Sequence, residues 1–225
     1  MGRNLVRIGK ELPMTDFISA EGFEKTFRYG KLIGQGLLVT IMLALFTVAI
    51  GFVLGIILAI MRMTDIRPFR FLAYDKNGRL RNSKVLIAIS KFNPVSFFAT
   101  AYVEILRSTP VIVQIMIIYL GVFSVIKLPS FTFFGFIKFN RFFPGVVALG
   151  MNSGAYLCEI IRSGMQSIDG GQNEAARSLG LSSFQTLLYI IMPQAIRNIL
   201  PAIANEFVVI IKESAITYTI GMQDI

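Results

Sequence analysis

An acidic residue inside an apolar stretch is the feature of this sequence that most clearly suggests binding chemistry. Glu206 lies in the run 186–211, thirteen residues after Pro193. If that run is a helix in a membrane, a rise of 1.5 Å per residue places Glu206 about 20 Å deep. An acidic group there costs roughly 2.5 to 3.5 kcal/mol, so it needs a partner or a water-filled cavity. We take Glu206 as the first candidate for a substrate contact, with the adjacent Asn205 adding hydrogen bonds.

Glu206 also has a purely structural interpretation, an internal ion pair with Arg197, Lys212 or a neighbouring helix. Three further polar side chains lie in apolar runs and are candidates for substrate contacts: Asn152, Ser153 and Gln114. Asn152 and Ser153 could line the same cavity as Glu206 or could form hydrogen bonds between helices. Gln114 has the same two interpretations.

No constellation of residues in the sequence predicts catalysis or metal binding. There is no histidine, one cysteine, and no pair of acidic side chains within apolar runs at a useful spacing. The sequence also lacks a phosphate-binding loop of the form GxxxxGK[ST], so we do not expect this chain to bind or hydrolyse ATP itself. We therefore expect no catalytic residue, no metal ligand and no cofactor.

The composition predicts a membrane protein. Hydrophobic residues make up 54% of the chain and charged residues only 16%, and the mean hydropathy is +0.66. Between Lys31 and Arg62 the sequence has thirty residues without a charge, which exceeds the roughly 20 that span a bilayer and is too long for a cleaved signal. The net charge of +9 comes from loops between apolar runs, so we do not expect nucleic acid as a partner.

Four apolar runs are long enough to be membrane spans, at about 32–61, 94–126, 142–161 and 186–211. The loop 62–91 contains eight Lys or Arg, and the positive-inside rule places it in the cytoplasm. The loop 127–141 and the N-terminus then lie outside, and the segment after Arg162 lies inside. Residues 1–31 mix charged and aromatic side chains, which predicts an interfacial lead-in.

In two of these runs, particular residues predict how a helix packs or how deep it lies. In the first run, Gly51 and Gly55 have the spacing that lets two helices approach closely, and packing within the chain is the favoured use. In the second run, Glu104 and Arg107 lie three residues apart on one helical face, and we expect them near its cytoplasmic end.

A short helix with clear start and stop signals is predicted between the third and fourth runs. Asp169 and Gln172 have the spacing of a capping box, which predicts a helix at 173–179. Gly180 supplies a left-handed stop, and Ser182 to Gln185 repeats the capping-box spacing.

The side chains of this short helix suit docking to a partner. Ala175 and Ala176 are small enough for close approach, Glu174 and Arg177 can make charged contacts, and Leu179 is an apolar knob. These side chains favour a helix that inserts into a groove of a partner. Composition alone is equally compatible with a simple connector between two spans.

This segment resembles the EAA loop of ABC-type importer permeases. The resemblance rests on Glu174-Ala-Ala176, Gly180, Ile190 and Met192-Pro193, with methionine where the family usually has leucine. It extends to the polar amino acid subgroup through stretches that begin at Gly36, Tyr102, Ala155, Gly171 and Pro193.

The resemblance implies an all-α integral membrane protein with the helical bundle of a type I ABC importer permease. It implies a lead-in at 1–31 and one permease domain at 32–225, with the cytoplasmic loop at 62–91 and the coupling loop at about 162–185. The residues that it assigns to ATPase coupling are Gly171, Glu174, Ala175, Ala176, Arg177, Leu179 and Gly180.

The same resemblance implies the partners, the cargo and the location. ATP would be bound and hydrolysed by separate ATPase subunits, an extracytoplasmic binding protein would deliver an amino acid, polar or cationic, and a second permease, identical or related, would complete a dimer. The chain would be a multi-pass protein in the lipid bilayer of the bacterial cytoplasmic membrane.

Two features depart from the family pattern. The region from about 71 to 98 is longer than usual, and four spans are visible where the family has about five, so we expect a last return helix to be missing. The alternative function is an ion-coupled carrier or a channel, with Glu104, Arg107 and Glu206 as its intramembrane charges. That alternative leaves the EAA loop unexplained.

Overall fold

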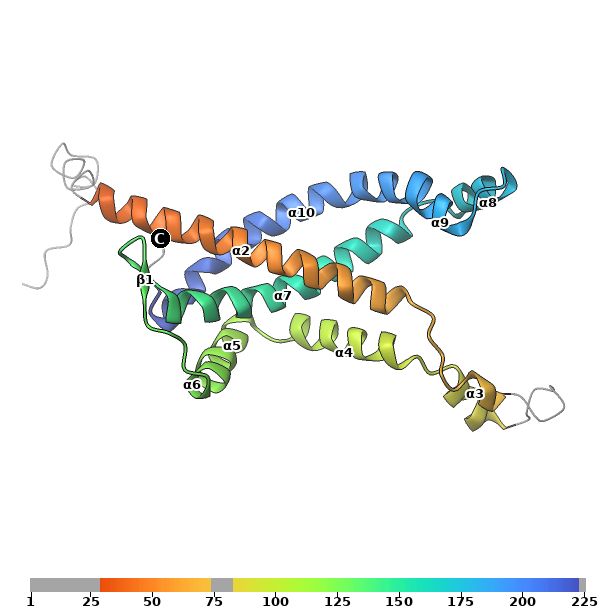
Figure 1. The fold of residues 1–225 in the computed structure, drawn as a ribbon, viewed down its shortest axis with the longest axis horizontal. Helices are drawn as coiled ribbons and strands as arrows, with labels where there is room; N and C mark the ends of the chain where they lie inside the picture. The colour runs from red at the N-terminus through yellow and green to blue at the C-terminus, as the bar shows by residue number, and fades with distance from the viewer. Residues whose placement is uncertain (1–28, 74–82, 223–225) are drawn as a thin grey trace, which may run out of the picture.

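Three long helices lie side by side and form the body of the molecule (Figure 1). The computed structural model describes residues 29–73 and 83–222. The long helices are α2 (Gly30–Met63), α7 (Phe139–Gln166) and α10 (Met192–Ser214), and each contacts the other two. A fourth helix, α4 (Pro94–Ser108), packs against α2 and α7.

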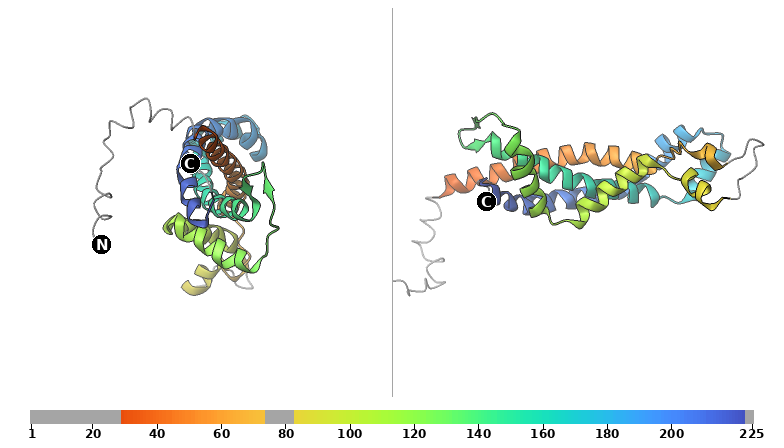
Figure 2. Two further views of the ribbon diagram at one scale, coloured as in Figure 1. Left: turned by 90° about the vertical axis from the view of Figure 1, so that its left-hand side faces the viewer. Right: turned by 90° about the horizontal axis from the view of Figure 1, so that it is seen from below.

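Shorter elements occupy the two ends of the bundle (Figure 2). Those at one end are η2 (Arg70–Ala73), α3 (Lys84–Ser90), α8 (Gly170–Ser178), α9 (Ser183–Thr186) and the π-helical η4 (Leu187–Ile191). Those toward the other end are α5 (Val111–Met116), the π-helical η3 (Ile117–Val122), α6 (Phe123–Val125), the hairpin of β1 (Thr132–Phe133) with β2 (Ile137–Lys138), and η5 (Ala215–Ile220). The described parts of the two predicted cytoplasmic loops therefore lie at one end, and the predicted outer loop lies at the other.

The apolar character of the helices differs. Within the described residues, α2 is the one helix that is long and apolar enough to cross a membrane alone. The helices α3 and α4 are long and apolar enough only when taken as one pair, and they are bent by 76° relative to each other. The segment Val111–Val125 is apolar but shorter. The helices α7 and α10 have the length but are more polar, and several of their polar residues are buried against other helices.

The helices α2 and α7 approach each other closely through glycines. A methyl group on Gly51 would lie 2.9 Å from Ser153 Oγ, and one on Gly55 would lie 2.8 Å from Leu157 Cβ and 3.1 Å from the backbone nitrogen of Cys158. These distances are too short for any larger residue without movement of a helix. The predicted use of the glycine pair, packing within the chain, is confirmed.

The second predicted span, 94–126, is not one helix. The helix α4 ends at Ser108, the backbone is extended at Thr109, and α5 begins after Pro110. Proline has no N–H to continue the helical hydrogen bonds and restricts the residue before it. The length of the run already indicated that it is too long for one straight helix perpendicular to the membrane, but the position of the break was not predicted because the apolar composition is continuous across it.

The predicted depth of Glu104 and Arg107 is also wrong. Tyr102 donates a hydrogen bond of 2.9 Å to the carbonyl of Met151, and the guanidinium of Arg107 lies 5.1 Å from the centre of the Tyr156 ring. This part of α4 therefore lies beside the middle of α7, and not at its cytoplasmic end. The antiparallel course of α4 and α7 is visible in Figure 1.

The apolar core has two parts. One surrounds Leu43, Ile115 and Leu149 at the hairpin end of the bundle. The other surrounds Leu58, Val103 and Cys158, farther along α2 and α7 toward the end that carries α8. Both parts centre on α2 and α7, so these two helices form the frame against which the other elements are positioned.

Candidate functional site

The helix α8 lies at one end of the bundle (Figure 1). Local hydrogen bonds cap both of its ends. The Asp169 carboxylate accepts a hydrogen bond of 2.8 Å from the Gly171 N–H, so the predicted N-cap is confirmed. Gln172 does not complete a capping box, and the helix starts at Gly170, three residues before the predicted start. Gly180 has a φ of +82°, which confirms the predicted left-handed stop.

The turn after α8 also follows the prediction. Ser182 Oγ accepts from the Gln185 N–H, and the Gln185 side chain accepts from the Ser182 N–H at 2.9 Å, which completes a capping box for α9. The guanidinium of Arg177 donates to Ser183 Oγ at 2.6 Å. These bonds fix the angle between α8 and α9.

The predicted coupling residues divide into an outward set and an inward set. Leu179 is 84% exposed, and Glu174 and Ala175 are also exposed. Ala176 is 4% exposed, and α8 contacts α9 and η4, so Ala176 permits close packing within its own chain. Gly171, Arg177 and Gly180 are exposed as well, so Ala176 is the one buried member of the predicted coupling set.

A cavity of about 490 Å³ separates α8 from the ends of the long helices. Met63 of α2, Met165 of α7 and Leu187 of η4 line its apolar side, and Asp169 and Arg177 line its polar side. The helix α8 is joined to the bundle through its two flanking connections, its contacts with η4 and a hydrogen bond of 3.5 Å from Gln194 of α10 to Gln172.

Glu206 is buried at 7% exposure on α10, as its unusual position predicts. It faces Ser153 of α7, and Ser153 Oγ makes no hydrogen bond of good geometry. Within the described residues, no basic side chain lies within 4 Å of Glu206, so the alternative of an internal ion pair with Arg197 or Lys212 is not seen. Asn205 is exposed and does not join this pair.

Gln114 and Asn152 form a separate hydrogen-bonded group at the break between α4 and α5. The amide nitrogen of Gln114 donates to the carbonyls of Leu106 and Thr109 at 2.7 and 2.9 Å. Asn152 donates to Gln114 Oε1 at 3.1 Å. Sequence alone did not distinguish substrate contact from packing here, and the structure brings these two amides together without Glu206.

The family follows from comparison with known proteins. Residues 85–224 match the family described as the binding-protein-dependent transport system inner membrane component. The chain belongs to this family of permeases.

Individual relatives agree with that assignment. The permease is 38% identical over 191 residues to the putative glutamine transport system permease protein GlnP of Rickettsia prowazekii, covering 85% of this chain and 72% of the relative. It is 35% identical over 203 residues to the arginine transport system permease protein ArtQ of Bacillus subtilis, covering 90% of this chain and 77% of the relative.

Solved structures agree with the fold. One chain from a crystal structure of an amino acid ABC transporter with histidines is 37% identical, with a TM-score of 0.69 over 90% of the permease and 78% of that chain. A chain of the MetNI methionine ABC transporter is 16% identical with a TM-score of 0.58, covering 84% of the permease and 74% of that chain, which supports the fold alone. The expected type I importer bundle is confirmed.

One polar group of the permease was missed by sequence reasoning. Glu159 of α7 forms ion pairs with Arg62 of α2 at 2.5 Å and with Arg162 of α7. The i, i+3 spacing of Glu159 and Arg162 was a possible signal, but the contact with Arg62 joins residues 97 positions apart. We call Arg62, Glu159 and Arg162 the charged clamp.

The charged clamp is continued by bonds to α4. Asn93 donates to the carbonyl of Thr64 at 2.5 Å, and Ser96 Oγ donates to the carbonyl of Arg62 at 3.2 Å. The ends of α2, α4 and α7 are therefore tied together close to the start of the coupling loop.

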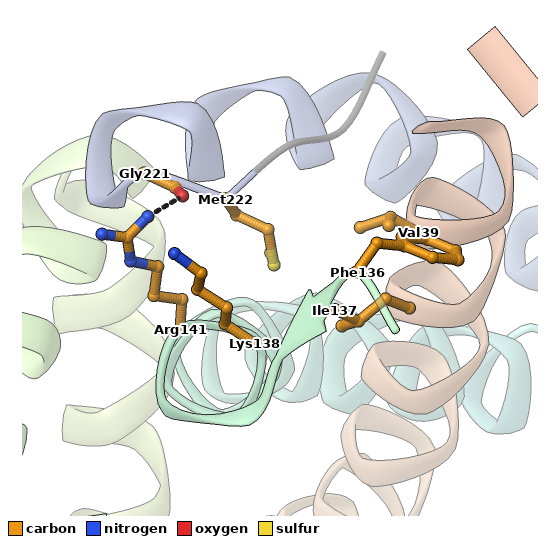
Figure 3. Close-up of a pocket in the computed structure, with 7 residues that line it drawn as sticks. All are labelled: Val39, Phe136, Ile137, Lys138, Arg141, Gly221 and Met222. Carbon is orange, nitrogen blue, oxygen red and sulfur yellow. Dashed lines mark hydrogen bonds between the residues drawn. The ribbon is translucent and has the colours of Figure 1, made fainter. Parts of the chain in front are cut away.

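A small cavity lies at the hairpin end of the permease, opposite α8 (Figure 3). Lys138 and Arg141 point into it, and Arg141 donates to the carbonyl of Gly221 at 2.5 Å. Its volume of about 60 Å³ is far below the roughly 300 Å³ of a typical small-molecule site. It is too small to hold an amino acid.

Proposed function

We propose that this permease is the membrane-spanning subunit of an ATP-driven importer that carries an amino acid, polar or cationic, across the bacterial cytoplasmic membrane. The single observation that carries the proposal is the exposed helix α8, at whose end Leu179 is 84% exposed. The relatives named for glutamine and arginine transport support an amino acid as the cargo. No observation favours an ion-coupled carrier or channel, which would not need such a helix.

The energy for transport comes from partners. ATP is bound and hydrolysed on two separate ATPase subunits, and this chain binds no cofactor of its own. A substrate-binding protein delivers the cargo at the hairpin end, and a second permease, identical or related, completes the pathway. In this arrangement, closure of the ATPases pushes α8, and the connections on both sides of α8 transmit the movement to α7 and α10.

Among the predicted substrate contacts, Glu206 with Ser153 is the pair that we retain for a cationic group of the cargo. Both are buried, and Ser153 Oγ has a hydrogen-bonding capacity that the described residues do not use. Asn205 remains a proposed contributor from the exposed side of α10. Gln114 and Asn152 already satisfy backbone carbonyls, so we assign them to holding the α4 to α5 break.

The first experiment measures the affinity of the purified permease for its ATPase and ATP-driven uptake in proteoliposomes that contain the binding protein. Leu179→Ala removes the exposed anchor, and a hot-spot residue of this kind contributes about 2 kcal/mol, or roughly 30-fold in affinity. Uptake by Leu179→Ala should fall together with its affinity for the ATPase. Uptake by the wild type should continue in the presence of proton uncouplers.

The matched control is Phe134→Ala, which removes a similarly exposed apolar side chain at the opposite end. We expect it to leave ATPase affinity unchanged. Equal ATPase affinity of Leu179→Ala and wild type would show that α8 is only a connector, and uptake that stops with uncouplers would favour a carrier.

A further inference from the structure

Two opposite charges are exposed side by side at the middle of the bundle. Tyr102 and Leu106 of α4 are hydrogen-bonded to the segment 151–152 of α7. That segment is central in α7, about 20 Å from either end at 1.5 Å per residue. Glu104 and Arg107 belong to the same part of α4, and both are exposed. They lie beside the middle of α7 and are not covered by the described parts of this chain.

These two charges do not neutralise each other. Although they are three residues apart on α4, no ion pair joins them within 4 Å. Arg107 lies over the ring of Tyr156, 5.1 Å from its centre, a cation–π contact that fixes the guanidinium and leaves its N–H donors available. Neither Glu104 nor Arg107 has a hydrogen-bond partner for its side chain among the described residues.

Charges in this position are incompatible with contact with lipid tails. Acidic and basic side chains within membrane helices face the bundle interior or a water-filled cavity, because exposure to hydrocarbon is costly. The α4 surface that carries Glu104 and Arg107 must therefore face water, a polar ligand or another subunit, and of these we argue for the ligand. In this conformation Glu206 is buried against α7, whereas Glu104 and Arg107 are exposed at the surface of the chain.

The pair matches the charges of a free amino acid at neutral pH. A guanidinium binds a carboxylate through parallel charge-assisted hydrogen bonds, and a carboxylate binds an ammonium group. Residues at i and i+3 have neighbouring positions on a helix, and the α-ammonium and α-carboxylate groups of an amino acid are attached to one carbon. The two functional groups that all amino acids share can therefore contact both residues together.

We propose that Glu104 and Arg107 bind the α-ammonium and α-carboxylate groups of the transported amino acid, with Tyr156 positioning the guanidinium. This inference rests on the proposed function, and it assigns recognition of the shared backbone groups to α4.

The test is calorimetric binding to the intact permease–ATPase complex in detergent. The probes are L-arginine and L-glutamine, each compared with its decarboxylated analogue, agmatine or 4-aminobutanamide. The wild type should bind the preferred amino acid at least about tenfold more tightly than its analogue. Arg107→Gln should weaken binding of that amino acid by about 10- to 100-fold and leave binding of the analogue unchanged.

Further variants separate charge from structure. Arg107→Lys should restore part of the lost affinity, and Glu104→Gln should weaken binding of the amino acid and of its analogue alike, because both carry the ammonium group. Lys91→Gln, an exposed charge at the α8 end, is the control and should bind as the wild type does.

The outcomes distinguish this inference from the proposed function. If the wild type binds an amino acid and Arg107→Gln binds it equally well, the assignment of Arg107 is overturned. If the variants instead lose the second permease subunit in size-exclusion chromatography, the pair belongs to a subunit interface, which also overturns it. If the intact wild-type complex binds neither amino acid, the proposed cargo class fails first.

Discussion

Gln114 shows how one side chain can stabilise a backbone break within a membrane helix bundle. Pro110 leaves the carbonyls before it without helical donors, and the Gln114 amide supplies two of the missing hydrogen bonds. The sequence contains both residues, but the hydropathy of an apolar run does not reveal whether a glutamine faces a cavity or a carbonyl. Asn152 completes the group from another helix, so this role needed tertiary information.

Replacement of Gln114 should destabilise the fold. Gln114→Leu leaves the carbonyl of Thr109 without a partner and the carbonyl of Leu106 with only the 3.4 Å hydrogen bond from Asn152, at a cost of about 1 to 3 kcal/mol. Unfolding in mixed micelles titrated with SDS measures this difference. Gln172→Leu, at an exposed position on α8, is the control. Equal stability of Gln114→Leu and wild type would show that water replaces the lost donor.

Glu206 should affect the choice of cargo. Glu206→Gln keeps the size of the side chain but removes its charge, and a charge-assisted hydrogen bond contributes about 1.5 to 3 kcal/mol. If Glu206 contacts a cationic side chain, uptake of arginine should fall by about tenfold or more relative to uptake of glutamine in proteoliposomes. An unchanged ratio of the two rates would assign Glu206 to structure.

At the level of helices, the sequence predicts best where local signals agree. The helix α2 follows from an uncharged run, and α8 follows from Asp169 at its start and Gly180 at its end. The break after Ser108 was missed because hydropathy averages over a whole run. The charged clamp could not be predicted because Arg62 and Glu159 meet only when α2 and α7 pack together.

The glycine contacts between α2 and α7 predict whether a glycine-to-alanine change raises or lowers the free energy of unfolding. Alanine favours a helix over glycine by about 1 kcal/mol, so Gly34→Ala, with nothing within 4 Å of the new methyl group, should stabilise α2 slightly. Gly55→Ala places its methyl group 2.8 Å from Leu157 Cβ and should destabilise the permease by about 1 to 3 kcal/mol. The same SDS titration measures both, and stabilisation by Gly55→Ala would contradict the close packing.

For the whole molecule, the charged clamp lies between the coupling loop and the body of the bundle. It joins the ends of α2 and α7, and neighbouring bonds add the start of α4. The cavity of about 490 Å³ lies beneath α8. A push on α8 is therefore carried by its covalent connections to α7 and α10 while the clamp keeps α2, α4 and α7 together.

Loss of the clamp should reduce coupling more than stability. Glu159→Gln removes both ion pairs, but the carboxylate is partly exposed, so we expect a loss of only about 1 kcal/mol in unfolding free energy. The number of ATP molecules hydrolysed per amino acid imported should rise, because α8 movements are transmitted less fully. Arg67→Gln, which breaks an exposed ion pair with Asp65, should leave that ratio unchanged, and a normal ratio for Glu159→Gln would restrict the clamp to folding.

The glycine-mediated contact between α2 and α7 also encloses Cys158, the single thiol of the sequence, which is 0% exposed. A maleimide reagent cannot reach this sulfur while the two helices stay packed. The native chain is thus already suitable for site-directed spin labelling. One cysteine introduced at an exposed position on α8 and another in the hairpin would carry paired nitroxides, and their separation could be followed through the nucleotide cycle by pulsed resonance without removal of the native thiol.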